Sequence, residues 1–182
     1  MGKIYDTLDA ETQVWLSRQK VFFVATAPRA AEGHINCSPK GGDAFRVLNE
    51  REVAYQDLTG SGIETVAHLR ENGRIVLMFC AFEGEPRIVR LHGSGQVLEP
   101  EDAGFAELER LFPENPGTRT IVKVTLKRVA DSCGFAVPFY DYLGGRPTLD
   151  KWAGKKGKEG LDDYRHKNNQ LSIDGLPGLK KT

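Results

Sequence analysis

The sequence predicts a mainly β fold in which one sheet carries flanking helices. Short runs of β-branched and aromatic residues recur along the chain, and Gly and Pro residues separate them. At 182 residues, of which 40% are hydrophobic, the chain has the length and apolar content for one core. The expected strands cover residues 21–27, 34–38, 53–57, 74–79, 87–97 and 121–127.

Short helices are expected between these strands. Asp9 and Glu11 place acidic groups in the first turn of an opening helix, where the helix dipole favours them. Residues 63–71 show helical spacing of apolar side chains. Pro100 begins a further helix that is expected to run to Leu111.

The second strand, at 34–38, is expected to pair with the first one in a hairpin. Pro39 should end it, because proline has no backbone N–H to donate to a sheet. Residues 1–132 hold every expected strand, whereas residues 133–182 are rich in Gly, Lys and Asp. We therefore expect a barrel domain over 1–132 and a helical or irregular extension over 133–182. A partner subunit is one surface on which this extension could pack.

Charge and cysteine content narrow the function classes. The 25 Lys and Arg residues balance 25 Asp and Glu residues, which disfavours nucleic-acid binding. The start of the sequence resembles no signal peptide and no stretch is apolar enough to span a membrane, so we expect a cytoplasmic protein without membrane contact. The 3 cysteines are widely spaced and are expected to be free thiols, with Cys37 a small buried residue.

Two segments have the composition of a phosphate-binding pocket. Gly60-Ser61-Gly62 precedes the expected helix at 63–71, where small residues and unpaired amides suit an anion. Lys40 lies in a glycine-flanked loop and can supply positive charge if the two segments are neighbours. Taken alone, the same pattern also fits an ordinary strand-to-helix turn and a solvated lysine.

The order of several segments resembles the pyridoxamine 5′-phosphate oxidase-like flavoproteins. The stretch from His34 to Gly41 is similar to a strand and loop of that family, 54–57 and 64–74 to its next strand and helix, and 87–93 to a later strand. The resemblance covers about residues 10 to 130. It implies an FMN-binding split β-barrel that forms a homodimer with flavin sites at the interface.

The resemblance also implies which residues hold the cofactor. One group lies along the flavin ring and reaches its phosphate, a second lies beside the ring, and a third closes on the phosphate. In chain order the three groups are Asn36, Cys37, Ser38, Pro39 and Lys40; Tyr55, Gln56 and Asp57; and Thr59, Ser61, Gly62, Glu64 and Thr65. No catalytic residue and no metal ligand is assigned.

Two departures separate the sequence from true pyridoxamine phosphate oxidases. The Arg-Lys pair that those enzymes carry at this helix start is absent from residues 62–65, and their C-terminal Trp and Arg-x-His pattern has no clear counterpart in 152–169. We therefore expect an FMN-dependent oxidoreductase that moves a hydride between a small organic substrate and the flavin. The alternative is a non-catalytic carrier or sensor of flavin, haem or deazaflavin.

Overall fold

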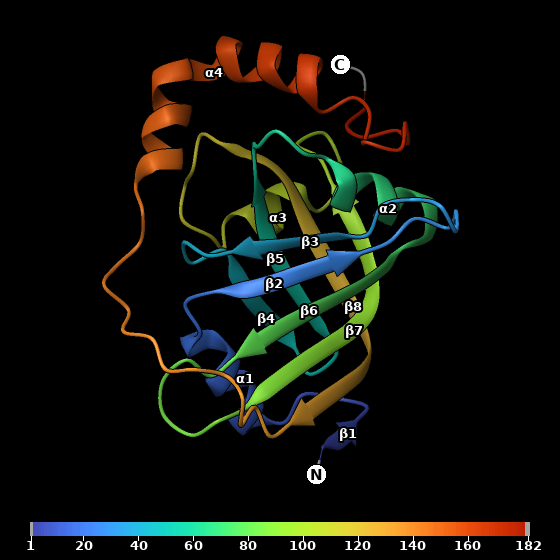
Figure 1. The fold of residues 1–182 in the computed structure, drawn as a ribbon. Coiled ribbons are helices and arrows are strands. Elements are labelled where there is room, and N and C mark those ends of the chain that lie inside the picture. Colours follow the sequence, from blue (N-terminus) through green and yellow to red (C-terminus); the bar gives the residue numbers. More distant parts are fainter. Residues whose placement is uncertain (1, 181–182) are drawn as a thin grey trace.

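The computed structural model describes residues 2–180, which form an antiparallel sheet with flanking helices (Figure 1). The strands are β1 (Lys3–Tyr5), β2 (Phe22–Thr26), β3 (Asn36–Lys40), β4 (Phe45–Asn49), β5 (Glu52–Leu58), β6 (Arg74–Cys80), β7 (Ile88–Leu98) and β8 (Thr118–Ser132). The helices are α1 (Ala10–Arg18), α2 (Glu64–Asn72), α3 (Phe105–Glu109) and α4 (Thr148–Asn168). None of the described helices is long and apolar enough to cross a bilayer.

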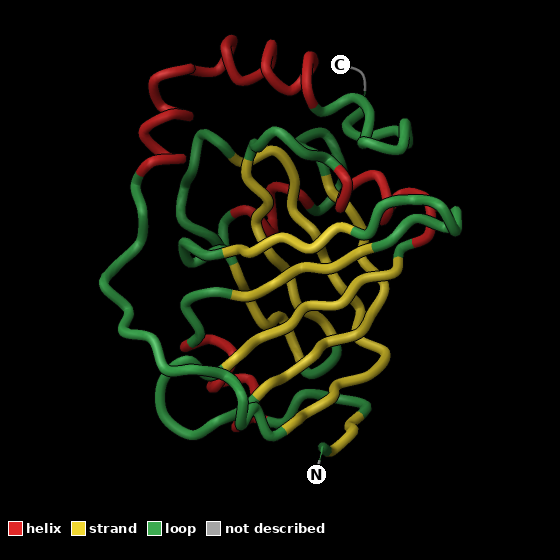
Figure 2. The backbone as a smooth tube through the Cα atoms, viewed as in Figure 1, coloured by secondary structure: helices red, strands yellow, loops and turns green. Residues whose placement is uncertain are grey.

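The sheet is curled and open. Its strand order is β3-β2-β6-β7-β8-β5-β4, and β1 pairs with β8 outside this path. Within residues 2–180, no ladder joins β3 at one end to β4 at the other. Figures 1 and 2 show the curled sheet bringing β2 and β3 across β4 and β5. The expected barrel is thus a curled antiparallel sheet with one opening.

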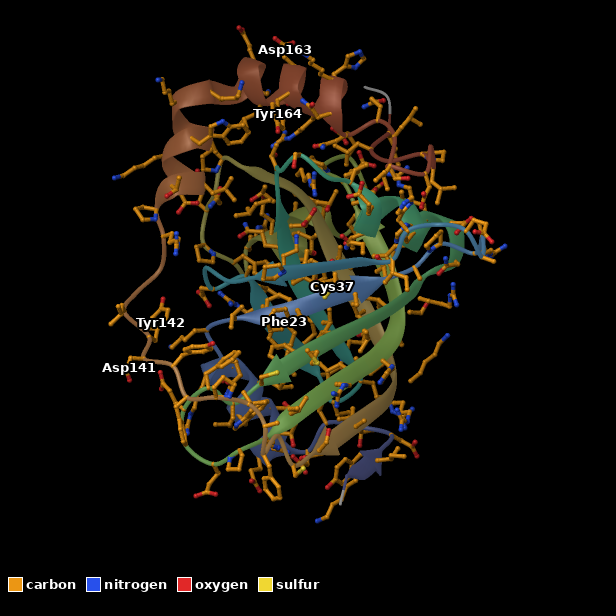
Figure 3. All side chains as sticks on the ribbon, in the orientation of Figure 1. Phe23, Cys37, Asp141, Tyr142, Asp163 and Tyr164 are labelled. Atoms are coloured by element: carbon orange, nitrogen blue, oxygen red, sulfur yellow. The ribbon has the colours of Figure 1, made fainter. Side chains whose placement is uncertain are left out.

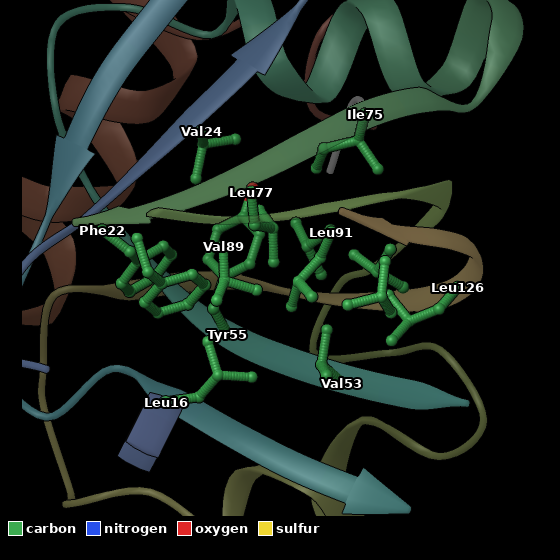
Figure 4. Close-up of a cluster of buried hydrophobic side chains, with 14 of the residues drawn as sticks. Leu16, Phe22, Val24, Val53, Tyr55, Ile75, Leu77, Val89, Leu91 and Leu126 are labelled. Carbon is green, nitrogen blue, oxygen red and sulfur yellow. The ribbon is translucent and has the colours of Figure 1, made fainter. Parts of the chain in front are cut away.

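The core fills the inside of this curl (Figure 4). Alternate residues of β2 point inward, so Phe22 and Val24 are buried together with Leu77 of β6 and Tyr55 of β5. The rings of Phe22 and Phe79 stack with centroids 5.3 Å apart. Each such buried side chain contributes about 1.5–3 kcal/mol relative to an exposed one, so this cluster stabilises the curled shape.

The strand that contains Pro39 differs from the prediction. β3 continues through Pro39 and Lys40 instead of ending before them. In the order of the sheet β3 is an end strand, paired with β2 alone. Proline is tolerated on an edge strand because its missing N–H can face away from the ladder, so the expectation that Pro39 ends the strand was wrong.

Other boundaries also moved. The short strands β1 and β4 were not anticipated, and α3 covers only Phe105–Glu109. β8 extends well beyond residues 121–127, because it pairs with β7, β5 and β1 along its 15 residues. α1 begins after Asp9, whose carboxylate accepts a hydrogen bond from the Thr12 amide at 2.7 Å. Gly73 ends α2 in the left-handed conformation (φ 70°).

The C-terminal extension packs against the sheet of the same chain. An extended segment carrying Asp141 and Tyr142 runs beside the sheet, and α4 then passes over one of its ends (Figures 1 and 3). α4 is kinked at Gly157, whose φ is 65°. Arg165 near its end donates a hydrogen bond to the Thr59 hydroxyl at 2.9 Å, so the helix contacts the turn after β5.

The β7–β8 pairing requires a glycine at position 93. A Cβ there would collide with the Thr125 carbonyl oxygen of β8, next to a bulge in the ladder. We expect Gly93→Ala to lower the free energy of unfolding by about 1–3 kcal/mol, measured by urea denaturation. Gly154→Ala is the control, because a Cβ at that helical position meets no atom within 4 Å and should stabilise by about 0.5–1 kcal/mol. Equal effects of the two substitutions would contradict this account of the bulge.

Candidate functional site

A cleft of about 680 Å³ lies at the opening of the sheet, between β3 on one side and β5 on the other. The turn after β5 and the start of α2 close its inner end, and residues 145–150 of the extension form an outer wall. The predicted site residues that line it are Asn36, Ser38, Pro39, Lys40, Gln56, Thr59, Gly62, Glu64 and Thr65. The curl of the sheet therefore brings together the two segments that the sequence suggested.

A buried carboxylate holds the two sides of this opening. Asp57 on β5 is 1% exposed, and its Oδ1 accepts a hydrogen bond from Lys40 Nζ on β3 at 2.6 Å. Its Oδ2 accepts a second one from Arg119 Nε on β8 at 2.7 Å. Because β3 and β5 share no ladder, the Lys40–Asp57 ion pair directly links them across the opening.

Electrostatics explain why Asp57 stays ionised. Its burial acts to raise the pKa, but the neighbouring charges of Arg119 and Lys40 and their hydrogen bonds together hold the pKa well below the usual range. One carboxylate, that of Asp57, thus faces two cations. Lys40 and Arg119 also line the cleft, where their N–H groups are of the kind that suits an anionic ligand.

The start of α2 is open to a ligand on its cleft side. Among residues 2–180, its N-cap residue Ile63 makes no side-chain capping bond, so this side chain leaves the first amides of the helix uncapped. Asn36 Nδ2 on β3 donates to Thr65 Oγ1 at 2.9 Å, which links the edge strand to the first turn of the helix. The Glu64 carboxylate folds back over Gly62, and its Oε1 accepts from the Ile173 amide at 3.3 Å.

Four of the predicted residues do not line the cleft. Asp57 lies beneath Lys40, and Ser61 is exposed at the tip of the turn. Tyr55 points into the core, where it is 0% exposed and burial raises its pKa well above the usual value. Cys37 is exposed on β3, so the expectation of a small buried residue was wrong: along a strand, alternate side chains face opposite sides, and Asn36 and Ser38 take the cleft side.

Sequence reasoning missed three residues at the site that lie outside the predicted segments: two arginines and one asparagine. Arg119 lines the cleft and is 6% exposed, yet it precedes the stretch 121–127 that was expected to be the strand. Arg146 lines the outer wall, and Asn169 binds the Arg119 side chain at 3.0 Å. A basic residue in the polar run before an alternating strand was the one available signal for Arg119. Nothing local marked Asn169, because its partners lie 50 and 109 positions away.

The fold and the cleft are those of a split-barrel-like protein with a polar site at the opening of its sheet. The family model described as pyridoxamine 5′-phosphate oxidase matches residues 8–133. The Aspergillus flavus protein described as pyridoxamine 5′-phosphate oxidase family protein ustO is 41% identical over 98% of this chain and 78% of its own length. The chain therefore belongs to the pyridoxamine 5′-phosphate oxidase family, as its ordered segments suggested.

A solved structure shares the fold at low identity. HupZ from Group A Streptococcus is 18% identical, with a TM-score of 0.53 over 67% of this chain and 92% of HupZ. The family match ends at residue 133, so the C-terminal extension lies outside it. The relative from A. flavus differs in this respect, because its match covers nearly all of this chain.

Removing the buried carboxylate tests its structural role. Asp57→Asn leaves Arg119 buried without a counter-charge, so we expect it to lower the free energy of unfolding by about 3–5 kcal/mol at pH 7, measured by urea denaturation. Asp43→Asn is the control, since Asp43 pairs with Arg46 at the surface and is 69% exposed. Asp43→Asn should lower the free energy of unfolding by at most about 1 kcal/mol.

The same variant has a pH signature. The pKa of Asp57 is lower in the folded chain than in the unfolded one, where it is about 3.9. Its contribution is therefore complete above that value and is lost as the pH falls from about 4 towards the folded pKa. On acidification, the free energy of unfolding of wild type should therefore lose the contribution of ionised Asp57. The Asp57→Asn variant has no such contribution to lose. Parallel pH profiles for the two proteins would contradict the assignment.

Proposed function

We propose that this chain binds FMN in the cleft and acts as an FMN-dependent oxidoreductase that moves a hydride between a small organic substrate and the flavin. The observation that carries the proposal is the meeting of Lys40, Ser38 and the uncapped start of α2 at the opening of the sheet. Positive charge, hydroxyl groups and free amides are the groups that bind a phosphate. Membership of the family supports the same cofactor.

The residues present fit FMN. A cleft of about 680 Å³ falls within the range of cofactor-sized pockets. Gly42 and Gly60 line it and leave room for a ligand to approach the backbone. We assign the phosphate to Lys40, Ser38, Thr65 and the first amides of α2. The side-chain amides of Asn36 and Gln56 are assigned to the polar edge of the ring.

The flavin, when bound, supplies the hydride chemistry. The residues of this chain bind it, orient it and shape the space for a substrate. Gln56 is fixed for such a role, because its Nε2 donates to Thr118 Oγ1 at 2.8 Å and it is 3% exposed. Residues 145–150 of the extension contribute to the lining of the cleft.

The lining of the cleft favours a flavin over haem. Haem iron is held by His, Cys, Met or Tyr side chains. Among the described residues, none of these four types lines the cleft. A deazaflavin presents a similar shape and would be distinguished by its spectrum.

The absorption spectrum of the purified protein and an FMN titration test the cofactor. We expect a flavin spectrum, or saturable binding when FMN is added. Lys40→Ala should raise the Kd for FMN about 10- to 100-fold, because a hydrogen bond to a charged group contributes about 1.5–3 kcal/mol. Lys20→Ala is the matched control, since Lys20 lies over the ring of Tyr142 and lines a different cleft. An absence of any FMN binding by wild type would refute the proposal.

We also propose that the chain forms a homodimer in which flavin sites lie at the interface. Large apolar side chains are exposed along the extended segment before α4, and a patch of this kind marks an interaction surface. They are Phe135, Phe139, Tyr140, Tyr142 and Leu143. Family membership makes a second copy of this chain the expected partner.

We further propose that the protein is cytoplasmic. The thiols of its three cysteines are free, which fits a reducing compartment.

Sedimentation velocity tests the dimer. Wild type should sediment at twice the mass of the chain. Phe139→Ser combined with Leu143→Ser should weaken association, because both side chains are more than three-quarters exposed in the single chain (78% and 97%). Ile4→Ser, at an exposed position on β1, is the control and should leave the dimer intact. A monomeric wild type at all concentrations would contradict the proposed assembly.

A further inference from the structure

The C-terminal residues hold the glycine turn through a buried amide. Asn169 directly follows α4 and is 0% exposed. Its Nδ2 donates to the Gly60 carbonyl at 2.9 Å, and its Oδ1 accepts from Arg119 Nη1 at 3.0 Å. Both ends of this side chain are thus used, one on the turn and one on the guanidinium beside it.

Arg119 completes the same arrangement. Besides Asn169, its Nη1 donates to the Gly62 carbonyl at 2.8 Å and more weakly to that of Gly60 at 3.4 Å. Its Nε is held by the buried Asp57 carboxylate, so the guanidinium is fixed in position. The carbonyl groups of Gly60 and Gly62 therefore both point towards a rigid set of donors.

The direction of these carbonyls determines the direction of the neighbouring amides. In a planar trans peptide, the N–H of the next residue points opposite to the carbonyl. The amides of Ser61 and Ile63 therefore point away from the Arg119 and Asn169 side chains. In the described part of the chain neither amide donates to a protein acceptor. Ser61 and Ile63 themselves do not line the cleft, which the turn borders through Gly60 and Gly62 and the helix through Glu64 and Thr65.

The residues after Asn169 keep this arrangement in place. The Leu179 amide donates to the Asn169 carbonyl at 2.9 Å, which folds the segment back on itself. Gly178 lies so close to Ile63 and to the Asn169 carbonyl that it leaves no room for a side chain. The segment from 169 to 179 therefore packs directly on the residue that precedes α2.

We propose that Asn169 is a positioning residue for the phosphate of the flavin. It acts through the turn: by fixing the Gly60 carbonyl and the Arg119 guanidinium, it holds the turn that leads into α2 and so keeps the first amides of that helix beside the anion. The C-terminal extension is then part of the binding site, although the family match ends before it. This inference rests on FMN binding as proposed above.

Titrations with FMN and with riboflavin test it, because riboflavin has the same ring and lacks the phosphate. Asn169→Ala should raise the Kd for FMN about tenfold, the equivalent of one hydrogen bond to a charged group, and should leave the Kd for riboflavin unchanged. Asn169→Asp keeps an acceptor for Arg119, but it sets a carboxylate oxygen against the Gly60 carbonyl and adds negative charge near the anion, so it should raise the Kd for FMN at least as much. It is the variant of equal size, to be used if Asn169→Ala folds poorly.

Asn168→Ala is the matched control, because the Asn168 side chain bonds only the Tyr164 carbonyl of its own helix. It should bind both ligands as wild type does. An equal loss of FMN and riboflavin affinity in both Asn169 variants would show a general structural role and overturn the proposal. Unchanged FMN binding in both would overturn it as well. Failure of wild type to bind FMN would instead refute the proposed function.

Discussion

The buried carboxylate of Asp57 is the constraint on which the site depends. An isolated ionised carboxylate in a protein interior is strongly disfavoured, so its burial requires partners of opposite charge. Lys40 and Arg119 supply them from strands that are far apart in the order of the sheet. The Lys40–Asp57 pair links β3 to β5, where the described residues form no ladder. The cleft exists because the opening is held at this width by charge as well as by packing.

The extension after residue 133 contributes part of the lining of the cleft, together with the strands of the sheet. Residues 145–150 form an outer wall of the cleft, and Arg165 and Asn169 contact the turn that forms its inner end. The site is thus built from a sheet matched by the family model and a tail that lies beyond that match.

Much of the sheet could be predicted from the sequence because local patterns specify it. Short runs of β-branched and aromatic residues predicted β2, β5 and β6, and alternation predicted β7 and the middle of β8. A glycine turn followed by helical spacing predicted α2. The continuation of β3 through Pro39 could not be foreseen, since it depends on that strand having one neighbour. Lys40 was predicted as a lone cation, but its partner Asp57 and the second cation Arg119 are set by the curl of the sheet. The role of Asn169 is a tertiary contact and leaves no local pattern.

The most direct test of the central claim is a crystal structure of the protein grown with FMN, in which the position of the phosphate is measured. The account predicts phosphate oxygens within hydrogen-bonding distance of Lys40 Nζ and of the amides at the start of α2, with the Asp57 ion pairs retained. A phosphate that projects into solvent, or a flavin bound in the separate cleft beside Trp15 and Tyr142, would contradict it.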